Sequence, residues 1–117
     1  MEQLISQLFA ARDAAHILHL RTRSFAAHMA LGELYDALVD LADALAENIQ
    51  GKYGLLDIQH PTQMFSDTDA VIFVRDLAAW AEMQRGVFNP ADTHLLNDWD
   101  NVISTVYKAK YKLENLA

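Results

Sequence analysis

Cysteine is absent from this chain of 117 residues, which excludes disulfide bonds, thiolate metal ligands and a cysteine nucleophile. A metal ion would have to be held by histidine and carboxylate groups, a ligand set suited to iron, manganese or zinc. No stretch reaches about 18 uninterrupted apolar residues, so we expect no membrane span. The start, MEQLISQLFAARDAA, carries acids within its apolar pattern, and we therefore expect no signal peptide and a cytoplasmic location.

Basic residues are also scarce: nine lysines and arginines face sixteen acids, which gives a net charge of −7. Such a charge repels nucleic acid unless a local basic patch overrides it. The best candidate patch is Lys108, Lys110 and Lys112, and lysines at the end of a helix complement its dipole. We therefore expect neither a membrane nor DNA as a partner.

Apolar residues make up 52% of the chain, and proline occurs only twice and glycine four times, which favours a compact helical fold. The apolar spacing predicts a first helix over about 2–20 and a second over about 25–50. Thr22 or Ser24 can cap the start of the second helix, and Gly51 is suited to end it.

Two further helices follow a longer connection. Ser66 and Asp69 form an approximate capping box for a third helix, which ends near Gly86. Asn89 then precedes a proline at the first position of a fourth helix, over about 90–116. We expect residues 1–117 to form one all-α domain, a four-helix bundle with a longer connection between its second and third helices.

The second predicted helix carries its acids and its leucines on opposite sides. At about 100° per residue, the leucines gather on one side and must face the core. A metal site inside the bundle of a single chain is therefore disfavoured. The acid stripe is either a solvated face or a face that meets another subunit, and periodicity alone leaves both readings open. Its members lie within roughly 80° of one another: Glu33, Asp36, Asp40, Asp43 and Glu47.

Histidines near the junction of the first two predicted helices bear on that choice. His19 lies within the apolar sector of the first helix or at its edge, and His28 opens the second helix beside the acid stripe. His16 lies further toward the flank. A lone histidine on such a face is more often a hydrogen-bonded core residue, but His19 and His28 could converge at one corner of the bundle. Convergence is what a histidine–carboxylate metal site requires.

Four stretches carry a family resemblance: HLRTRSFAAHMALGELYD at 19–36, the pair Asp43 and Glu47, QGKYG at 50–54, and YKAKYKLENL at 107–116. Together they resemble the Dps-like mini-ferritins of the ferritin-like superfamily. More specifically, they are similar to a short subfamily that is associated with bacteriophage genomes and often labelled a starvation-inducible transcriptional regulator. The resemblance implies a ferritin-like subunit that assembles into a hollow, commonly dodecameric shell and oxidises iron.

The resemblance also implies a site shared between subunits related by a two-fold axis. His19 and His28 match the ligand histidines of one subunit, and Asp43 and Glu47 match the acid pair that reaches in from its neighbour. Helix 25–50 would then lie against its mate in an isologous contact. Iron is the implied metal, with another divalent ion as the alternative.

The chain departs from the family pattern at several positions. Leu20 stands where the family usually has tryptophan, and Gly32 stands where it often has an aspartate one turn after the second histidine. Asp36, one turn further along, is the candidate substitute ligand. The turn between the histidines is short, and the longer family spacing selects His16 as a reserve ligand. The lysine-rich N-terminal tail that would support DNA binding is missing.

Gly32 and the missing tryptophan at Leu20 favour a rival hypothesis, in which the chain is a non-catalytic ferritin-like protein that serves as a phage structural component or contacts the host. Its location would then be the virion, or the host cytoplasm if the chain is phage-encoded. Among the remaining residues, we expect Trp80 in the core, leave Trp99 open between core and interface, and expect His60 and His94 at the surface.

Overall fold

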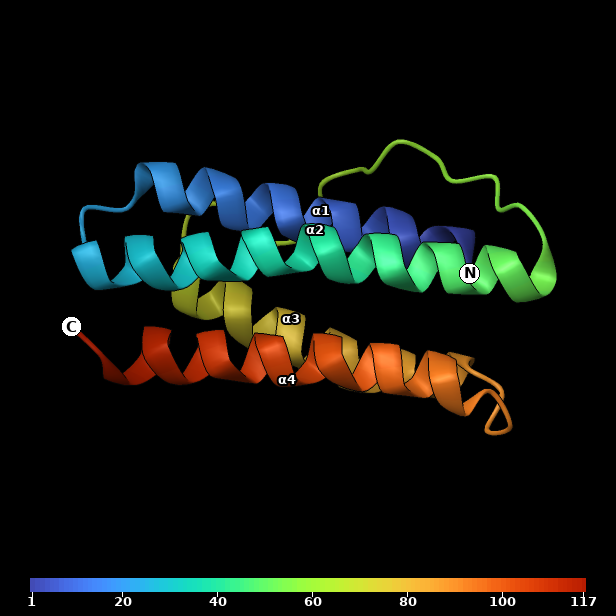
Figure 1. Ribbon diagram of the computed structural model, residues 1–117. Coiled ribbons are helices and arrows are strands. Elements are labelled where there is room, and N and C mark those ends of the chain that lie inside the picture. The colour runs from blue at the N-terminus through green and yellow to red at the C-terminus, as the bar shows by residue number, and fades with distance from the viewer.

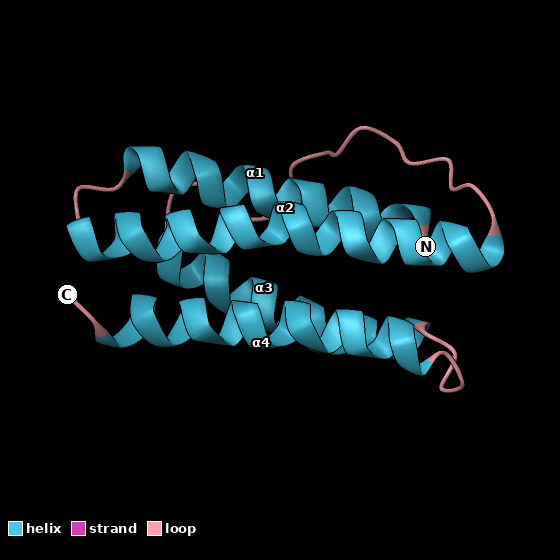
Figure 2. Ribbon diagram, in the orientation of Figure 1, coloured by secondary structure: helices cyan, strands magenta, loops and turns pink.

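The computed structural model describes residues 1–117 and contains four α-helices and no strand (Figures 1 and 2). The predicted all-helical bundle is confirmed. No helix combines the length and the apolar character needed to cross a membrane. The elements are α1 (Glu2–Arg21), α2 (Phe25–Tyr53), α3 (Ala70–Gln84), a short 3₁₀ helix η1 (Arg85–Val87) and α4 (Thr93–Asn115).

One long connection sets the directions of the helices. A short turn joins α1 to α2, which run antiparallel, and the segment after α2 then runs back along α1 before α3 begins (Figure 1). As a result, α3 runs parallel to α2, and α4 returns antiparallel to both. The closest packing joins α1 to α2, α2 to α4, and α3 to α4. The bundle therefore has a single long crossover, over residues 54–69.

Apolar side chains from all four helices form one continuous core. Trp99 is fully buried and belongs to it, which settles the choice that the sequence left open. Trp80 is only half-buried: it packs against the core, and its indole N–H donates to Gln7 Oε1 at 3.3 Å. On α2 the buried face contains Leu31, Leu34, Leu38, Leu45 and Ile49.

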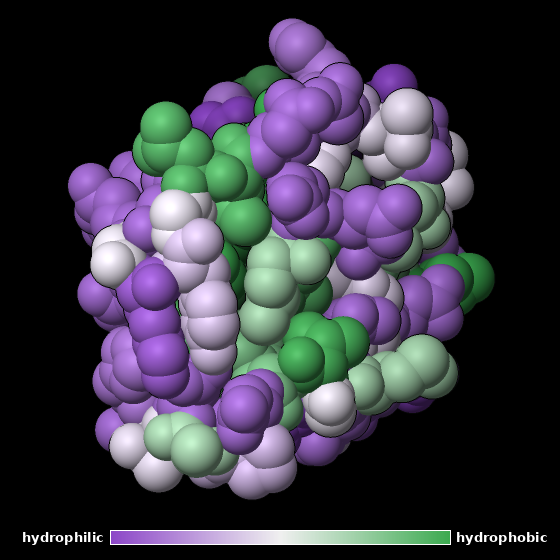
Figure 3. Space-filling model, turned by 90° about the vertical axis from the view of Figure 1, so that its right-hand side faces the viewer, coloured by the Kyte–Doolittle hydropathy of each residue, from purple (hydrophilic) through white to green (hydrophobic).

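The opposite side of α2 is exposed, as the helical wheel predicts. All five acids of the stripe lie on this side. Glu33 is the one member with an ion pair, to Lys112 of α4. At the end of the bundle where α2 ends and α4 begins, the surface shows hydrophobic areas separated by hydrophilic residues (Figure 3).

The predicted ends of α2 and α3 need correction. α2 continues through Gly51 to Tyr53, and Gly54 supplies the positive φ, 96°, at the helix end. α3 is capped by Asp69, whose carboxylate accepts a hydrogen bond from the Ile72 N–H at 3.0 Å. Of the predicted capping box, only the bond from the Asp69 N–H to Ser66 Oγ forms, at 3.2 Å. Glycine is favoured where φ is positive, and it is tolerated inside a helix that tertiary packing stabilises.

The start of α4 is also displaced. The helix begins at Thr93, with Asp92 as its N-cap, and not at Pro90. Asn89 still acts locally, because its Oδ1 accepts a hydrogen bond from the Ala91 N–H at 2.9 Å. That bond closes a turn before the helix, which explains why Asn89 and Pro90 together looked like a helix start. At α2, Ser24 is the cap, and its Oγ accepts from the Ala27 N–H.

Asp92 also joins the end of α2 to the start of α4. Its carboxylate is buried and accepts hydrogen bonds from Lys52 Nζ and Tyr53 Oη. The Lys52 ammonium, and after it the Tyr53 hydroxyl, hold the pKa of Asp92 below its ordinary value, because both stabilise the carboxylate form. The same contacts raise the pKa of Lys52 and of Tyr53.

We expect this cluster to make the fold sensitive to acid. A lowered folded-state pKa means that Asp92 stabilises the fold above about pH 4 and loses that effect as the pH falls through the folded-state value. Asp92→Asn should therefore lower the urea unfolding midpoint at pH 7, and the gap to wild type should narrow at pH 3. An equal gap at the two pH values would contradict the charged role of Asp92.

Candidate metal centre

The structure brings His19 and His28 together at the turn between α1 and α2. Their rings stack with centroids 3.7 Å apart and planes 18° from parallel. His19 Nδ1 lies 2.6 Å from the backbone carbonyl oxygen of His28, and His28 Nδ1 lies 2.8 Å from that of His19. Each ring is therefore tied to the backbone of the other helix, and the predicted convergence of the two histidines is observed.

These bonds fix which nitrogen of each ring is available. A carbonyl oxygen only accepts, so Nδ1 of His19 and of His28 must carry and donate a proton. In the neutral ring the lone pair then sits on Nε2, and neither Nε2 is a buried atom without a partner. Histidines that bind metals usually donate their second ring N–H to a carbonyl or a carboxylate, which orients the ring. The pair offers two nitrogen donors prepared in this way.

Gly32 lies directly beneath the His19 ring. A Cβ atom at this position would lie 3.0 Å from Cε1 and 3.1 Å from Nδ1 of His19. Glycine inside a helix costs about 1 kcal/mol relative to alanine. The absence of a side chain at position 32 therefore has a steric basis: the ring of His19 lies against the space where a side chain would begin.

A second pair of rings lies beside the histidines. His16, the reserve ligand, stacks on Tyr35 with centroids 4.2 Å apart, and the edge of Tyr35 faces His19 at 5.2 Å. The Arg12 guanidinium lies 5.3 Å from the centre of the Tyr35 ring. Sequence reasoning missed Tyr35, although it follows His28 by two helical turns and so shares a face with it.

The carboxylates of the predicted site do not reach the histidines of their own chain. Asp36, Asp43 and Glu47 are all exposed on α2. At 1.5 Å of rise per residue, Asp43 and Glu47 lie roughly 22 Å and 28 Å along the helix from His28. No three histidine, aspartate or glutamate side chains of one chain come close enough to hold a metal ion. One chain alone therefore supplies two nitrogen donors and a separate set of oxygen donors.

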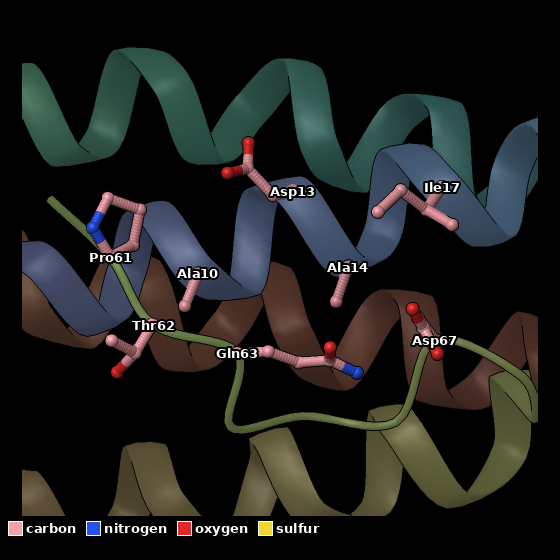
Figure 4. A pocket seen from close by; sticks show the side chains of 8 residues that line it. All are labelled: Ala10, Asp13, Ala14, Ile17, Pro61, Thr62, Gln63 and Asp67. Atoms are coloured by element: carbon pink, nitrogen blue, oxygen red, sulfur yellow. The ribbon is translucent and has the colours of Figure 1, made fainter.

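A hollow of about 180 Å³ lies between α1 and the long crossover, and neither His19 nor His28 lines it. Ala10 and Ala14 of α1 face the crossover, while the carboxylates of Asp13 and Asp67 do not point toward each other (Figure 4). Asp67 is also engaged by Arg21, whose guanidinium lies 3.6 Å from its carboxylate. This hollow therefore lacks converging ligands.

Other charged and titratable candidates remain at the surface. His60 and His94 are exposed, as predicted. Lys110 pairs with Glu114, and Lys112 pairs with Glu33, so acids neutralise two of the three lysines near the end of α4. The structure thus offers no concentrated basic patch on this helix.

Comparison with known proteins places the chain in a family. No curated protein and no solved structure matches it. Residues 19–113 match a family described as a family of unknown function, DUF5856. The matched region begins at His19 and contains His28, Gly32 and the whole acid stripe of α2. Because this region covers most of the sequence, the chain belongs to the DUF5856 family.

Proposed function

We propose that this protein binds iron in sites shared between two copies of the chain and oxidises the bound Fe(II), as its resemblance to the Dps-like mini-ferritins implies. The observation that carries the proposal is the histidine pair. His19 and His28 each donate Nδ1–H to a backbone carbonyl and keep Nε2 for a ligand. A histidine pair with only a structural role would need the two Nδ1 hydrogen bonds but would have no use for two Nε2 atoms without a partner.

The donor set suits iron, although one chain holds only part of it. Imidazole nitrogens and carboxylate oxygens are common ligands of iron and related divalent ions. Asp43 and Glu47 are exposed and have no ion pair with the rest of the chain. They lie too far from His28 to bind the same ion within one chain, so a second copy must supply them. The single long crossover of the bundle adds support, because ferritin-like bundles have one such connection.

The exposed face of α2 has the features of a contact between copies. Phe25 is 78% exposed and Val39 is 40% exposed. Both fall within about 60° of His28 around the helix, on the side that also carries Asp43. These apolar side chains and the unpaired acids Asp43 and Glu47 lie on the side of α2 that a second copy would cover in this proposal.

An antiparallel contact aligns the two halves of this face. If a two-fold axis passes beside residues 35–36, His28 of one copy lies opposite Asp43 of the other. The same register sets Gly32, where the His19 ring covers the backbone, opposite Val39 of the second copy. An isologous contact of this kind creates two equivalent sites. Larger assembly into a closed shell is a further part of the proposal.

The chemistry at such a site is the transfer of electrons from iron, which is the substrate. Two Fe(II) ions, one from each of the two equivalent sites, give up one electron each and become Fe(III). Hydrogen peroxide, acting as oxidant, accepts two electrons and two protons, its O–O bond breaks, and two waters form. The protein contributes the ligands, holds them in place and leaves coordination positions open. Exposed carboxylates nearby can receive the Fe(III) product, because hard cations prefer oxygen ligands.

An anaerobic Fe(II) titration of the purified protein tests this function. We expect saturable binding, an absorbance increase from Fe(III) when peroxide is added, and a solution mass of at least two chains. The matched control is His60→Ala, which changes an exposed histidine and should leave the result unchanged. Failure of the wild-type protein to bind Fe(II) would contradict the proposal.

A second candidate function is a non-catalytic interaction protein. It is favoured by Leu20, which is 71% exposed, and by Phe25, since both flank the turn between α1 and α2, close in sequence to the histidines. In that case the histidine pair would only join α1 to α2. An assembly that forms without binding Fe(II) at all would support this candidate.

A further inference from the structure

We propose that Gly32 is a positioning residue for the histidine pair and that it limits each shared site to one metal ion. The positioning rests on the contacts of His19 within one chain. The limit to one ion rests in addition on the proposed function. A double-mutant cycle in the metal-free protein tests the positioning, and an Fe(II) titration tests the limit to one ion.

The His19 ring is held on several sides at once. Its Nδ1 is bonded to the carbonyl of His28, one face stacks on the His28 ring, and Tyr35 meets it edge-on at 5.2 Å. The backbone of α2 at Gly32 forms a further side. A methyl group at position 32 would approach Cε1 and Nδ1 at 3.0 Å and 3.1 Å, which is closer than carbon atoms pack. The ring would have to shift by a few tenths of an ångström against its hydrogen bond and its stack to admit the methyl group.

Gly51 provides a matched comparison within the same helix. A Cβ atom added there meets nothing within 4 Å. Both glycines lie inside α2, and neither has a positive φ. Any difference between alanine substitutions at the two positions therefore reports the surroundings of Gly32 and not the general effect of glycine in a helix.

The missing side chain also decides how many ions the site can take. Position 32 lies one turn after His28, but the His19 ring fills the space beside it, so no carboxylate joins the site from this position. Helix-bundle sites that hold two iron ions use four carboxylates and two histidines. Here the shared site has two histidines with Asp43 and Glu47 of the second copy. That set resembles histidine–carboxylate sites for a single iron ion with open positions.

A double-mutant cycle in the metal-free protein tests the positioning. We expect Gly32→Ala to lower the urea unfolding midpoint in the wild-type background and to raise it in a His19→Ala background, where the ring is gone. Gly51→Ala should raise the midpoint in both backgrounds. If Gly32→Ala raised the midpoint of the wild-type protein as Gly51→Ala does, Gly32 would have no positioning role.

Ring NMR and metal stoichiometry complete the test. Proton–nitrogen spectra should show Nδ1–H on His19 and His28 in the wild type and in Gly51→Ala, and a change of this pattern in Gly32→Ala. Anaerobic Fe(II) titration should give one ion per chain, with affinity at least about tenfold weaker for Gly32→Ala and unchanged for Gly51→Ala.

The possible outcomes can be told apart. Two ions per chain, or equal affinity in the two glycine variants, would overturn the inference and leave the proposed function standing. No binding by the wild type would overturn the proposed function and the limit to one ion. The double-mutant cycle would still decide whether Gly32 positions His19.

Discussion

Replacing Asp43 and Glu47 together by alanine is expected to abolish iron oxidation and to weaken Fe(II) binding by at least about 100-fold. The two histidines alone lack the oxygen donors that hold Fe(II) and balance its charge. Both acids are exposed, so their removal leaves no cavity and should change the free energy of unfolding by about 0.5 kcal/mol or less per site. Anaerobic titration and the absorbance of Fe(III) after addition of peroxide measure the loss.

The matched control removes Glu33 and Asp40, two other acids of the same stripe. This variant carries the same net charge as the Asp43→Ala/Glu47→Ala variant and changes the same helix. We expect it to bind and oxidise iron almost as well as the wild type, because neither acid belongs to the proposed site. Equal losses in the two variants would show that the stripe acts only through its total charge, contrary to the proposal.

Trp99→Ala should have the largest effect on stability, lowering the free energy of unfolding by about 3–5 kcal/mol. The side chain is fully buried, and its indole N–H donates to the Ala81 carbonyl at 2.8 Å. Its ring packs against Trp80 and Phe88 with centroids 5.5 Å and 5.7 Å away. Truncation removes these contacts and leaves both a cavity and a carbonyl without its partner.

Trp80→Ala is the matched control for this substitution. Trp80 is only half-buried, and its N–H bond to Gln7 lies near the surface, so we expect a clearly smaller loss. Urea unfolding followed by circular dichroism gives both values. A loss below about 1 kcal/mol for Trp99→Ala would mean that the residue is not central to the core.

The bundle was predictable because its main signal is periodic. The leucines of α2 recur on one side and the acids on the other, so the buried and exposed faces followed from the 3.6-residue repeat. The helix ends were less predictable, because local signals compete. The sequence pattern selected Gly51 as the terminator, whereas α2 continues through it and ends at Tyr53, with Gly54 as the C-cap. Such tertiary override of local preference is common.

The histidine convergence was predictable, but its chemistry was not. His19 and His28 lie near the facing ends of two antiparallel helices, so their proximity follows from the short turn between them. The reciprocal bonds from Nδ1 to the backbone depend on ring orientation, which residue spacing does not determine. For the same reason Gly32 looked like a lost ligand, whereas the structure shows that it makes room for His19.

The Asp92 cluster was missed because its partners are distant in sequence. Lys52 and Tyr53 lie about forty positions before Asp92 and show no periodic relation to it. An aspartate after Asn89 and Pro90 reads as part of a helix start, and it serves that role as the N-cap of α4. Its burial depends on how the end of α2 packs against α4, which local patterns do not report.

Mixing two inactive variants tests most directly whether the metal site is shared. His19→Ala/His28→Ala lacks the nitrogen ligands, and Asp43→Ala/Glu47→Ala lacks the oxygen ligands, so neither should bind Fe(II) tightly alone. After the two are unfolded together and refolded as an equal mixture, each mixed pair regains one intact site of two. Statistical pairing predicts about a quarter of the wild-type binding capacity. A mixture that stays as inactive as its components would contradict a site built from two copies.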